Sequence, residues 1–321
     1  MQTSAITPAK GKYKVVNWKA YNASLCRRGD ITLWIDSSVL REWRDIDLSR
    51  KVVGEKQYPD SVILTCLTLC MQHHFALRQT TGFVRSLLKI LGYGEYAVPD
   101  YTTLSRRQSE LPVEVSQRWH NGEKIAIAID STGLKVFGEG EWKIRKHGVS
   151  KRRTWRKLHI GIDLDTQEIV SVALTGNEDD DAAVAVKMLK EKVKKLKSFS
   201  GDGAYDDFSF REILGDVKQI IPPPKDAIVH KGTKKAPLKD YLIQRNEAVE
   251  FIEGHDRKQW KIKEDYHRRS LNETVMFRYK TAFGGQVRAR KKENQSTEVK
   301  IKCKILNVYK DVGMPISYKV A

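Results

Sequence analysis

The sequence predicts an α/β domain built on a mixed five-stranded sheet with helices, preceded by a mainly helical region. Two observations predict this fold class. Short apolar runs of strand length occur at residues 125–129, 158–162 and 169–174, as expected for strands buried in a sheet. Before residue 123 the apolar residues follow a longer, helix-like spacing, interrupted by a glycine-bearing turn at 92–94. We therefore expect the chain to change there from a helical region to an α/β domain.

The charge balance indicates an acidic polymer as partner. The 321 residues include 58 Lys and Arg against 40 Asp and Glu, a formal net charge of +18, and such a surplus favours nucleic acid. Charge alone does not indicate an enzyme, because proteins that only bind nucleic acid are equally basic. The apolar content of 40% is typical of a globular chain and excludes a disordered one.

The lengths of the apolar runs and the setting of the cysteines indicate where the protein is expected to be located. No apolar run approaches membrane-spanning length, and the N-terminus has no apolar signal core. We therefore expect a cytoplasmic protein with no membrane partner. Cys66 and Cys70 lie in an apolar helical stretch, which favours buried thiols over a zinc site.

The N-terminal part is predicted to bind DNA. Residues 1–20 are polar and basic, and we expect a flexible arm. Residues 21–123 are predicted to be helical, with a helical stretch at 61–90, another helix from residue 99 and a linker from 112. A helix, a glycine-bearing turn and a further helix are consistent with a helix-turn-helix. That further helix opens with hydroxyl and guanidinium groups, which suit phosphate and base-edge contacts. These candidate DNA-binding residues are Thr102, Thr103, Arg106 and Arg107. A small helical bundle with a capped third helix explains the same pattern.

The α/β domain begins with three strands joined as an antiparallel meander. A basic loop separates the first two, since residues 143–157 hold eight Lys or Arg and no acid. After the third strand, the sequence predicts a helix at 182–196, a short strand before Asp202, a brief helix, and a strand at 218–221. A last helix follows at 266–280. This order of elements matches a ribonuclease-H-like domain.

Three carboxylates would converge in that fold. Asp130 lies on the first strand, Asp202 follows the fourth, and Glu273 lies on the late helix. Because the first and fourth strands are neighbours in a ribonuclease-H-like sheet, we expect the three side chains to meet. Three hard oxygen donors suit Mg²⁺ or Mn²⁺, and two such ions can activate water and stabilise the leaving oxygen in phosphodiester displacement. Taken singly, an aspartate after an apolar strand is equally consistent with a cap or a turn.

The late helix carries a charged face. At about 100° per residue, Tyr266, Arg269, Glu273 and Lys280 lie within about 60° of one another. A carboxylate flanked by two cations and a phenol suits a site for a metal ion and phosphates. Salt-bridged charges on a solvated surface are the simpler explanation of this helix alone. The two upstream aspartates favour the site.

Three motifs occur in a fixed order along the chain. Residues 130–136 read Asp-Ser-Thr-Gly-Leu-Lys-Val, residues 201–206 read Gly-Asp-Gly-Ala-Tyr-Asp, and the late helix fits Tyr-x2-Arg-x3-Glu-x6-Lys without a gap. Together they resemble the two catalytic blocks and the signature helix of bacterial insertion-sequence DDE transposases. The group named for insertion sequence five is the most similar. The resemblance covers residues 124–285 strongly and the helical region loosely.

This resemblance implies a DNA transposase. Such an enzyme binds the terminal inverted repeats of its element, cuts the ends and joins the 3′-hydroxyls to target DNA. Asp130, Asp202 and Glu273 would be the catalytic residues and would hold two Mg²⁺ ions, for which Mn²⁺ can substitute. The implied partners are double-stranded DNA, as transposon ends and target, and a second copy of the chain in a synaptic homodimer on the bacterial nucleoid. The implied DNA contacts near the cut are Tyr266, Arg269 and Lys280.

The remaining segments complete the predicted domains. Residues 225–259 would form a small insertion in the catalytic domain, and 286–321 a basic C-terminal tail with a strand near 299–305. The basic loop and the tail would follow the DNA backbone, so binding should weaken with salt. The loop residues expected to do so are Lys151, Arg152 and Arg153. Two alternatives remain: another ribonuclease-H-like nuclease, and a non-catalytic DNA-binding regulator derived from a transposase.

Overall fold

The N-terminal third of the chain is mainly helical in the computed structural model, which describes residues 13–47, 49, 56–136, 155–233 and 237–320. The helices in this part are α1 (Trp18–Arg27), α2 (Ser37–Arg44), α3 (Asp60–Gln72), α4 (Leu77–Ile90) and α5 (Tyr101–Gln108). Most of α3 is buried, so it is the centre of this layer. The helical stretch expected at 61–90 is two helices, because the chain turns at His74, whose φ of 58° is incompatible with a continuous helix.

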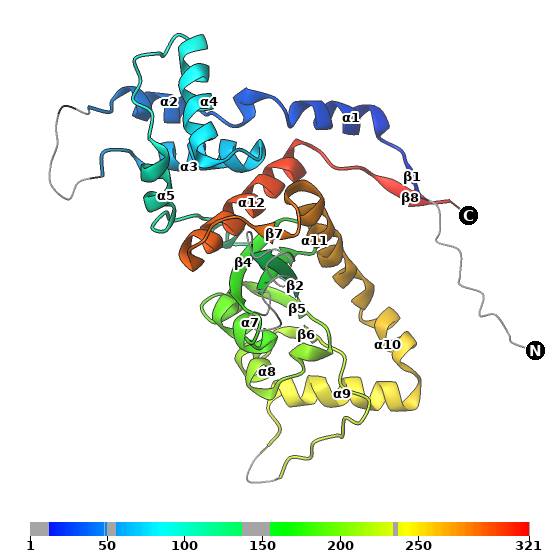
Figure 1. Cartoon of the computed structure of the whole chain (residues 1–321). Coiled ribbons are helices and arrows are strands. Elements are labelled where there is room, and N and C mark those ends of the chain that lie inside the picture. Colours follow the sequence, from blue (N-terminus) through cyan, green and yellow to red (C-terminus); the bar gives the residue numbers. More distant parts are fainter. Residues whose placement is uncertain (1–12, 48, 50–55, 137–154, 234–236, 321) are drawn as a thin grey trace, which may run out of the picture.

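A mixed sheet follows the helices. Strands β2 (Ile125–Val136), β3 (Trp155–Asp163) and β4 (Ile169–Gly176) form the expected antiparallel meander, and β5 (Leu196–Ser200) and β6 (Lys218–Ile220) are added in parallel beside β2. The order is β4-β3-β2-β5-β6 (Figure 1). A sixth strand that the sequence did not predict, β7 (Gln286–Val287), pairs with the far end of β2. A mixed sheet with helices is therefore confirmed.

Helices cover both faces of this sheet. On one face, α7 (Asp181–Leu189) and α8 (Phe208–Leu214) pack with the odd-numbered isoleucines of β2, from Ile125 to Ile129. On the other face, α11 (Ser270–Phe283) and α12 (Lys292–Val312) pack with Ala126 and Ala128. Successive residues of a strand point to opposite faces, so the even-numbered residues of β2 face α11.

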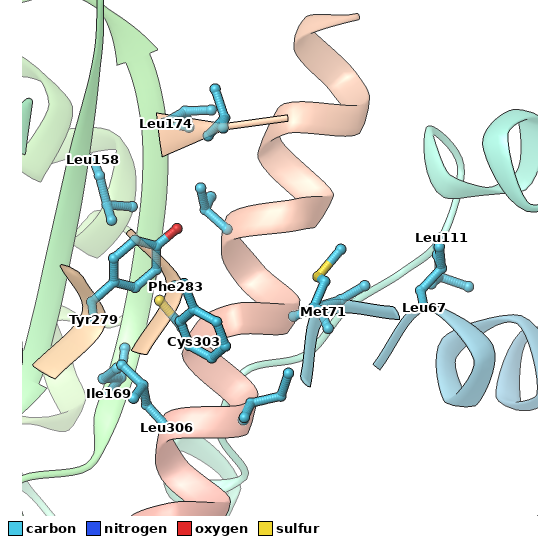
Figure 2. Packing of buried hydrophobic residues seen from close by; sticks show 14 of the residues in the cluster. Leu67, Met71, Leu111, Leu158, Ile169, Leu174, Tyr279, Phe283, Cys303 and Leu306 are labelled. Carbon is cyan, nitrogen blue, oxygen red and sulfur yellow. The ribbon is translucent and has the colours of Figure 1, made fainter. Parts of the chain in front are cut away.

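Helix α12 replaces the expected basic tail. It contacts α3 and α5 on one side and α11 and β4 on the other, and Figure 2 shows Cys303 and Leu306 near Tyr279 and Phe283, with Met71 on the opposite side of the helix. The strand expected at 299–305 is part of this helix. A helix buried between two layers is apolar on more than one face, so its sequence lacks a clear helical period and alternation can mimic a strand.

The two ends of the described chain pair with each other. Strand β1 (Tyr13–Val15) is antiparallel to β8 (Ser317–Lys319), and α1 begins at Trp18. The ordered structure therefore starts earlier than the expected boundary at residue 21. Residues 1–12, the first part of the expected arm, lie outside the described residues.

The expected insertion is helical. Helices α9 (Asp240–Gly254) and α10 (Arg257–Lys263) follow β6 and lead the chain to a 3₁₀ turn at Tyr266–Arg269, directly before α11 (Figure 1). The signature motif thus begins with Tyr266 and Arg269 in a 3₁₀ turn, and its α-helical part, which carries Glu273 and Lys280, begins at Ser270.

Candidate active site

Two neighbouring parallel strands bring Asp130 and Asp202 to the same end of the sheet. Ala128 of β2 pairs with Ser200 of β5, and each aspartate lies two residues farther along its chain. The Asp202 carboxylate accepts a hydrogen bond of 2.9 Å from the Ala204 amide, which fixes the turn after β5. In this turn a Cβ at Gly201 would lie 2.7 Å from the Tyr205 ring, so only glycine fits before Asp202.

Asn272 fixes the position of the helix that carries Glu273. Its side chain is fully buried, and Nδ2 donates hydrogen bonds of 2.9 Å to the carbonyl oxygens of Ala128 and Ile160. Ala128 lies two residues before Asp130 on β2, and Ile160 is the residue of β3 that pairs with Asp130. The sequence analysis missed Asn272. At about 100° per residue, Asn272 lies on the side of the helix that also carries Val275 and Tyr279, and a polar residue among these apolar ones was the available signal.

Arg269 links two of the three predicted catalytic carboxylates. Its Nη1 lies 2.9 Å from Asp130 Oδ2, and its Nη2 lies 2.6 Å from Glu273 Oε1. The guanidinium also lies 5.7 Å from the centre of the Tyr266 ring. Lys280 Nζ donates a hydrogen bond of 2.6 Å to Thr132 Oγ1 on β2. The signature residues thus gather beside the even-numbered side chains of β2.

The electrostatics of the site favour a cation. Burial raises the pKa of the Asp130 carboxyl, and the negative charge of Asp202 adds to this, against the opposing effects of the Ser131 amide and Arg269. Burial also raises the pKa of the Tyr266 hydroxyl, and the same two aspartates contribute. Two carboxylates that repel each other in a partly buried place are stabilised by a positive charge.

The donor set fits a divalent metal ion, although Arg269 now holds two of the donors. Three carboxylates supply the hard oxygen ligands that such ions prefer. Among the residues that the structure describes, no group of three His, Cys, Asp or Glu is placed to hold a metal ion. The Glu273 side chain is 58% exposed and is paired with the Arg269 guanidinium. Metal binding by all three would require Arg269 to release them.

A second polar cluster lies on the opposite face of β2. Asp181 Oδ2 accepts a hydrogen bond of 3.0 Å from Ser131 Oγ, and Asp181 Oδ1 lies 2.9 Å from Lys157 Nζ. Buried His159 lies 3.8 Å from the same carboxylate. The preceding residue, Asp180, instead caps α7 by accepting a hydrogen bond from the Ala183 amide.

Two family models match this chain, both described as the transposase DDE domain. One covers residues 121–308, from just before β2 to near the end of α12, and the other covers residues 26–139. The first spans more than half of the chain. The chain belongs to the transposase DDE domain family. The family carries metal-dependent nuclease and transposase activity, and its partner is DNA.

The predicted DNA contacts of this transposase domain protein lie at several places. Thr102, Thr103 and Arg106 lie in α5, where the Asp100 carboxylate accepts hydrogen bonds from the amides of both threonines and from the Thr102 hydroxyl. Arg107 donates to the Tyr58 carbonyl oxygen through Nη1 and pairs with Asp60 through Nη2, so both terminal nitrogens of its guanidinium are engaged. DNA contact by these four residues remains a prediction.

Other predicted contacts can be placed only in part. Lys151, Arg152 and Arg153 lie outside the described residues. Arg290 lines a hollow together with Arg78 and Arg106, beside Tyr101. This hollow places three guanidinium-bearing residues together on the helical region. Within the described part of the chain, no helix is long and apolar enough to cross a membrane.

Proposed function

We propose that the protein is the transposase of an insertion sequence of the group named for insertion sequence five. It would bind the terminal inverted repeats, cut them, and join the freed 3′-hydroxyls to target DNA. The single observation that carries this proposal is the meeting of Asp130 with Arg269 and Glu273 across β2 and α11, next to Asp202. Cations and carboxylates at one place suit phosphodiester chemistry.

The catalytic roles follow from the donor set. Asp130, Asp202 and Glu273 would hold two Mg²⁺ ions, or Mn²⁺ in their place. When bound, such ions activate the attacking water or hydroxyl and stabilise the leaving oxygen. Each donor has its own support: β2 carries Asp130, the Gly201 turn orients Asp202, and Asn272 seats the helix of Glu273.

The cations beside these carboxylates would hold the DNA end. Once it leaves Asp130 and Glu273, the Arg269 guanidinium can form paired hydrogen bonds with a phosphate. Tyr266 and Lys280 lie on the same face and would contact the phosphates or bases next to the cut. Helix α5 and the 143–157 segment would bind the flanking duplex, and two copies of the chain would meet when two ends are brought together.

Incubation of the purified protein with Mg²⁺ and DNA that carries the inverted repeats tests this function. We expect end cleavage and strand joining, both abolished in Glu273→Gln while DNA binding persists. Glu250→Gln, which removes an exposed carboxylate from α9, is the matched control and should keep full activity. Cleavage that persists in Glu273→Gln would refute the assignment of the site. Cleavage without joining would indicate a nuclease instead.

A further inference from the structure

A cavity of about 550 Å³ lies between α1, α11 and α12, and α11 also carries Glu273 of the candidate active site. Its wall also includes the segment at Met314 and Pro315, which is held in place from the other end of the chain. Asn17 Nδ2 donates to the Met314 carbonyl oxygen at 2.9 Å, and the Ile316 amide donates to Asn17 Oδ1 at 2.7 Å. The cavity is therefore a built part of the fold.

The lining of this cavity is positively charged. It includes Arg28, Arg278 and Lys310, and the described lining residues contain no Asp or Glu. Lys310 is paired with Glu168 and Asp311 outside the lining, so the two arginines carry the charge of the cavity. The Nε atom of Arg28 is buried and has no hydrogen-bond partner among the described residues. Burial lowers the pKa of Arg278, and the charge of Arg28 lowers it further. Two guanidinium groups that destabilise each other in one cavity favour an anion between them.

Aromatic rings accompany these cations. The Arg28 guanidinium lies 4.7 Å from the centre of the Tyr309 ring and 5.9 Å from that of Tyr21, and both tyrosines line the cavity. Phe277 also lines it, although its side chain is 70% exposed to solvent. Exposed aromatic rings next to arginines are what proteins use to stack unpaired bases whose phosphates are neutralised.

The position of the cavity connects it to the candidate active site. Phe277 follows Glu273 by one helical turn, and Arg278 lies about 7.5 Å farther along the helix axis than Glu273. Arg278 also lies about 140° farther around the helix, so a strand bound at Glu273 would reach the cavity by crossing the exposed face of α11 over Phe277.

We propose that this cavity binds an unpaired nucleotide of a DNA strand, with its phosphate between Arg28 and Arg278 and its base stacked on Phe277. The proposal rests on the proposed function only in taking DNA as the partner. It concerns binding, so a protein that fails to cut or join DNA still tests it.

Binding of a fluorescent oligothymidylate to the full-length protein, without metal and at fixed salt, tests the proposal. We expect Arg278→Gln and Phe277→Ala each to weaken binding by about 5-fold or more. Lys187→Gln removes an exposed charge from α7, and Ile228→Ala removes an exposed apolar side chain; both should bind within about 2-fold of the wild type. Arg278→Gln that binds as well as Lys187→Gln overturns the proposal.

Competing ligands test the proposed phosphate contact with Arg28 and Arg278, and crosslinking tests the proposed stacking of a base on Phe277. Displacement of the probe by thymidine 5′-monophosphate, and not by thymidine, supports the phosphate site, whereas a preference for thymidine overturns it. A strand containing 5-bromodeoxyuridine should crosslink to the wild-type peptide that carries Phe277, which avoids any folding defect of a variant. Crosslinks confined to other peptides contradict the stacking contact.

Discussion

Arg269 neutralises Asp130 and Glu273 at the place where the proposed function needs a divalent cation. The same side chain is also the group best placed to hold a DNA phosphate. These two roles exclude each other, because a guanidinium that is paired with two carboxylates has few donors left for a phosphate. Binding of metal and DNA together would shift Arg269 from the carboxylates to the phosphate.

Replacement of Arg269 should make the fold depend on metal. Without metal, Arg269→Gln leaves the partly buried Asp130 unpaired, and we expect a loss of about 1–2 kcal/mol in the free energy of unfolding. Mg²⁺ should raise the melting temperature because it binds only the folded state. The rise should be larger in this variant than in the wild type, where Arg269 competes with the metal for Asp130 and Glu273. Thermal unfolding with and without Mg²⁺ measures both effects.

Arg268→Gln is the matched control for that experiment. Arg268 also pairs with a carboxylate, at 2.6 Å from Asp165, away from the three catalytic candidates. This variant should lose stability without any added response to Mg²⁺. Equal responses in the two variants would contradict a metal site beside Arg269.

His159 should make the protein less stable in mild acid. Burial lowers the pKa of this histidine below its usual 6.5, so the unfolded chain binds a proton at a higher pH than the folded one does. Stability should therefore fall as the pH drops below about 6.5, and the fall should end near the lowered pKa. His159→Gln should flatten this dependence in urea unfolding, whereas replacement of exposed His255 by Gln should not. His73 and His74 shift in the same direction and would leave part of the slope.

At the scale of elements, the contact between β2 and α11 defines the site. β2 presents Asp130 and Thr132 to α11 and Ser131 to α7, so one strand serves two polar clusters. The amide of Asn272 bonds to two strands at once, and this fixes both the depth and the register of α11.

Loss of the Asn272 amide should impair catalysis and stability together. Asn272→Ala removes two buried hydrogen bonds between α11 and the sheet, so we expect a loss of about 1–3 kcal/mol in the free energy of unfolding. Glu273 would also lose its fixed position, so strand joining should fall even at a temperature where the variant stays folded. Asn121→Ala, at an exposed position, should change neither quantity. Full activity in a folded Asn272→Ala protein would contradict this positioning role.

Two kinds of element were predictable from the sequence. One is a helix or strand with a single buried face, and the other is a short strand buried on both faces. The run from Ile125 to Ile129 predicted β2 because few other structures bury five consecutive apolar residues next to an aspartate. Helix α12 was not predictable, since its burial between two layers removes the helical period. The ion pairs of Arg269 could not be predicted either, because they depend on the distance between β2 and α11, which no local pattern contains.

At the scale of the whole molecule, α12 joins the helical region to the sheet. Residues such as Val299, Cys303 and Leu306 belong to one continuous apolar core that includes α3 and β4. Inside it, Lys302 Nζ lies 2.6 Å from Glu298 Oε1, and Glu298 also accepts hydrogen bonds from the Arg288 and Ala289 amides after β7. The last long helix is thus part of the core of both regions.

Truncation should reveal this structural role. A chain that ends at residue 290 lacks α12 and should fail to fold, because both layers would expose the apolar surface that α12 covers. A chain that ends at residue 313 keeps α12 and loses only β8, and it should stay folded. Circular dichroism and limited proteolysis distinguish the two. If the chain that ends at residue 290 folds and only binds DNA more weakly, the structural role of α12 is contradicted and residues 286–321 act as a basic tail.

The place of α12 in the chain also affects the order of events during synthesis. The helical region leaves the ribosome long before α12 exists, and hydrogen bonds between that region and α12 join residues 186 and 237 positions apart. Contacts so distant in sequence form slowly and late. We therefore expect that a chain released early contains no folded helical region, so it could not compete with the complete protein for the DNA that we propose as its partner.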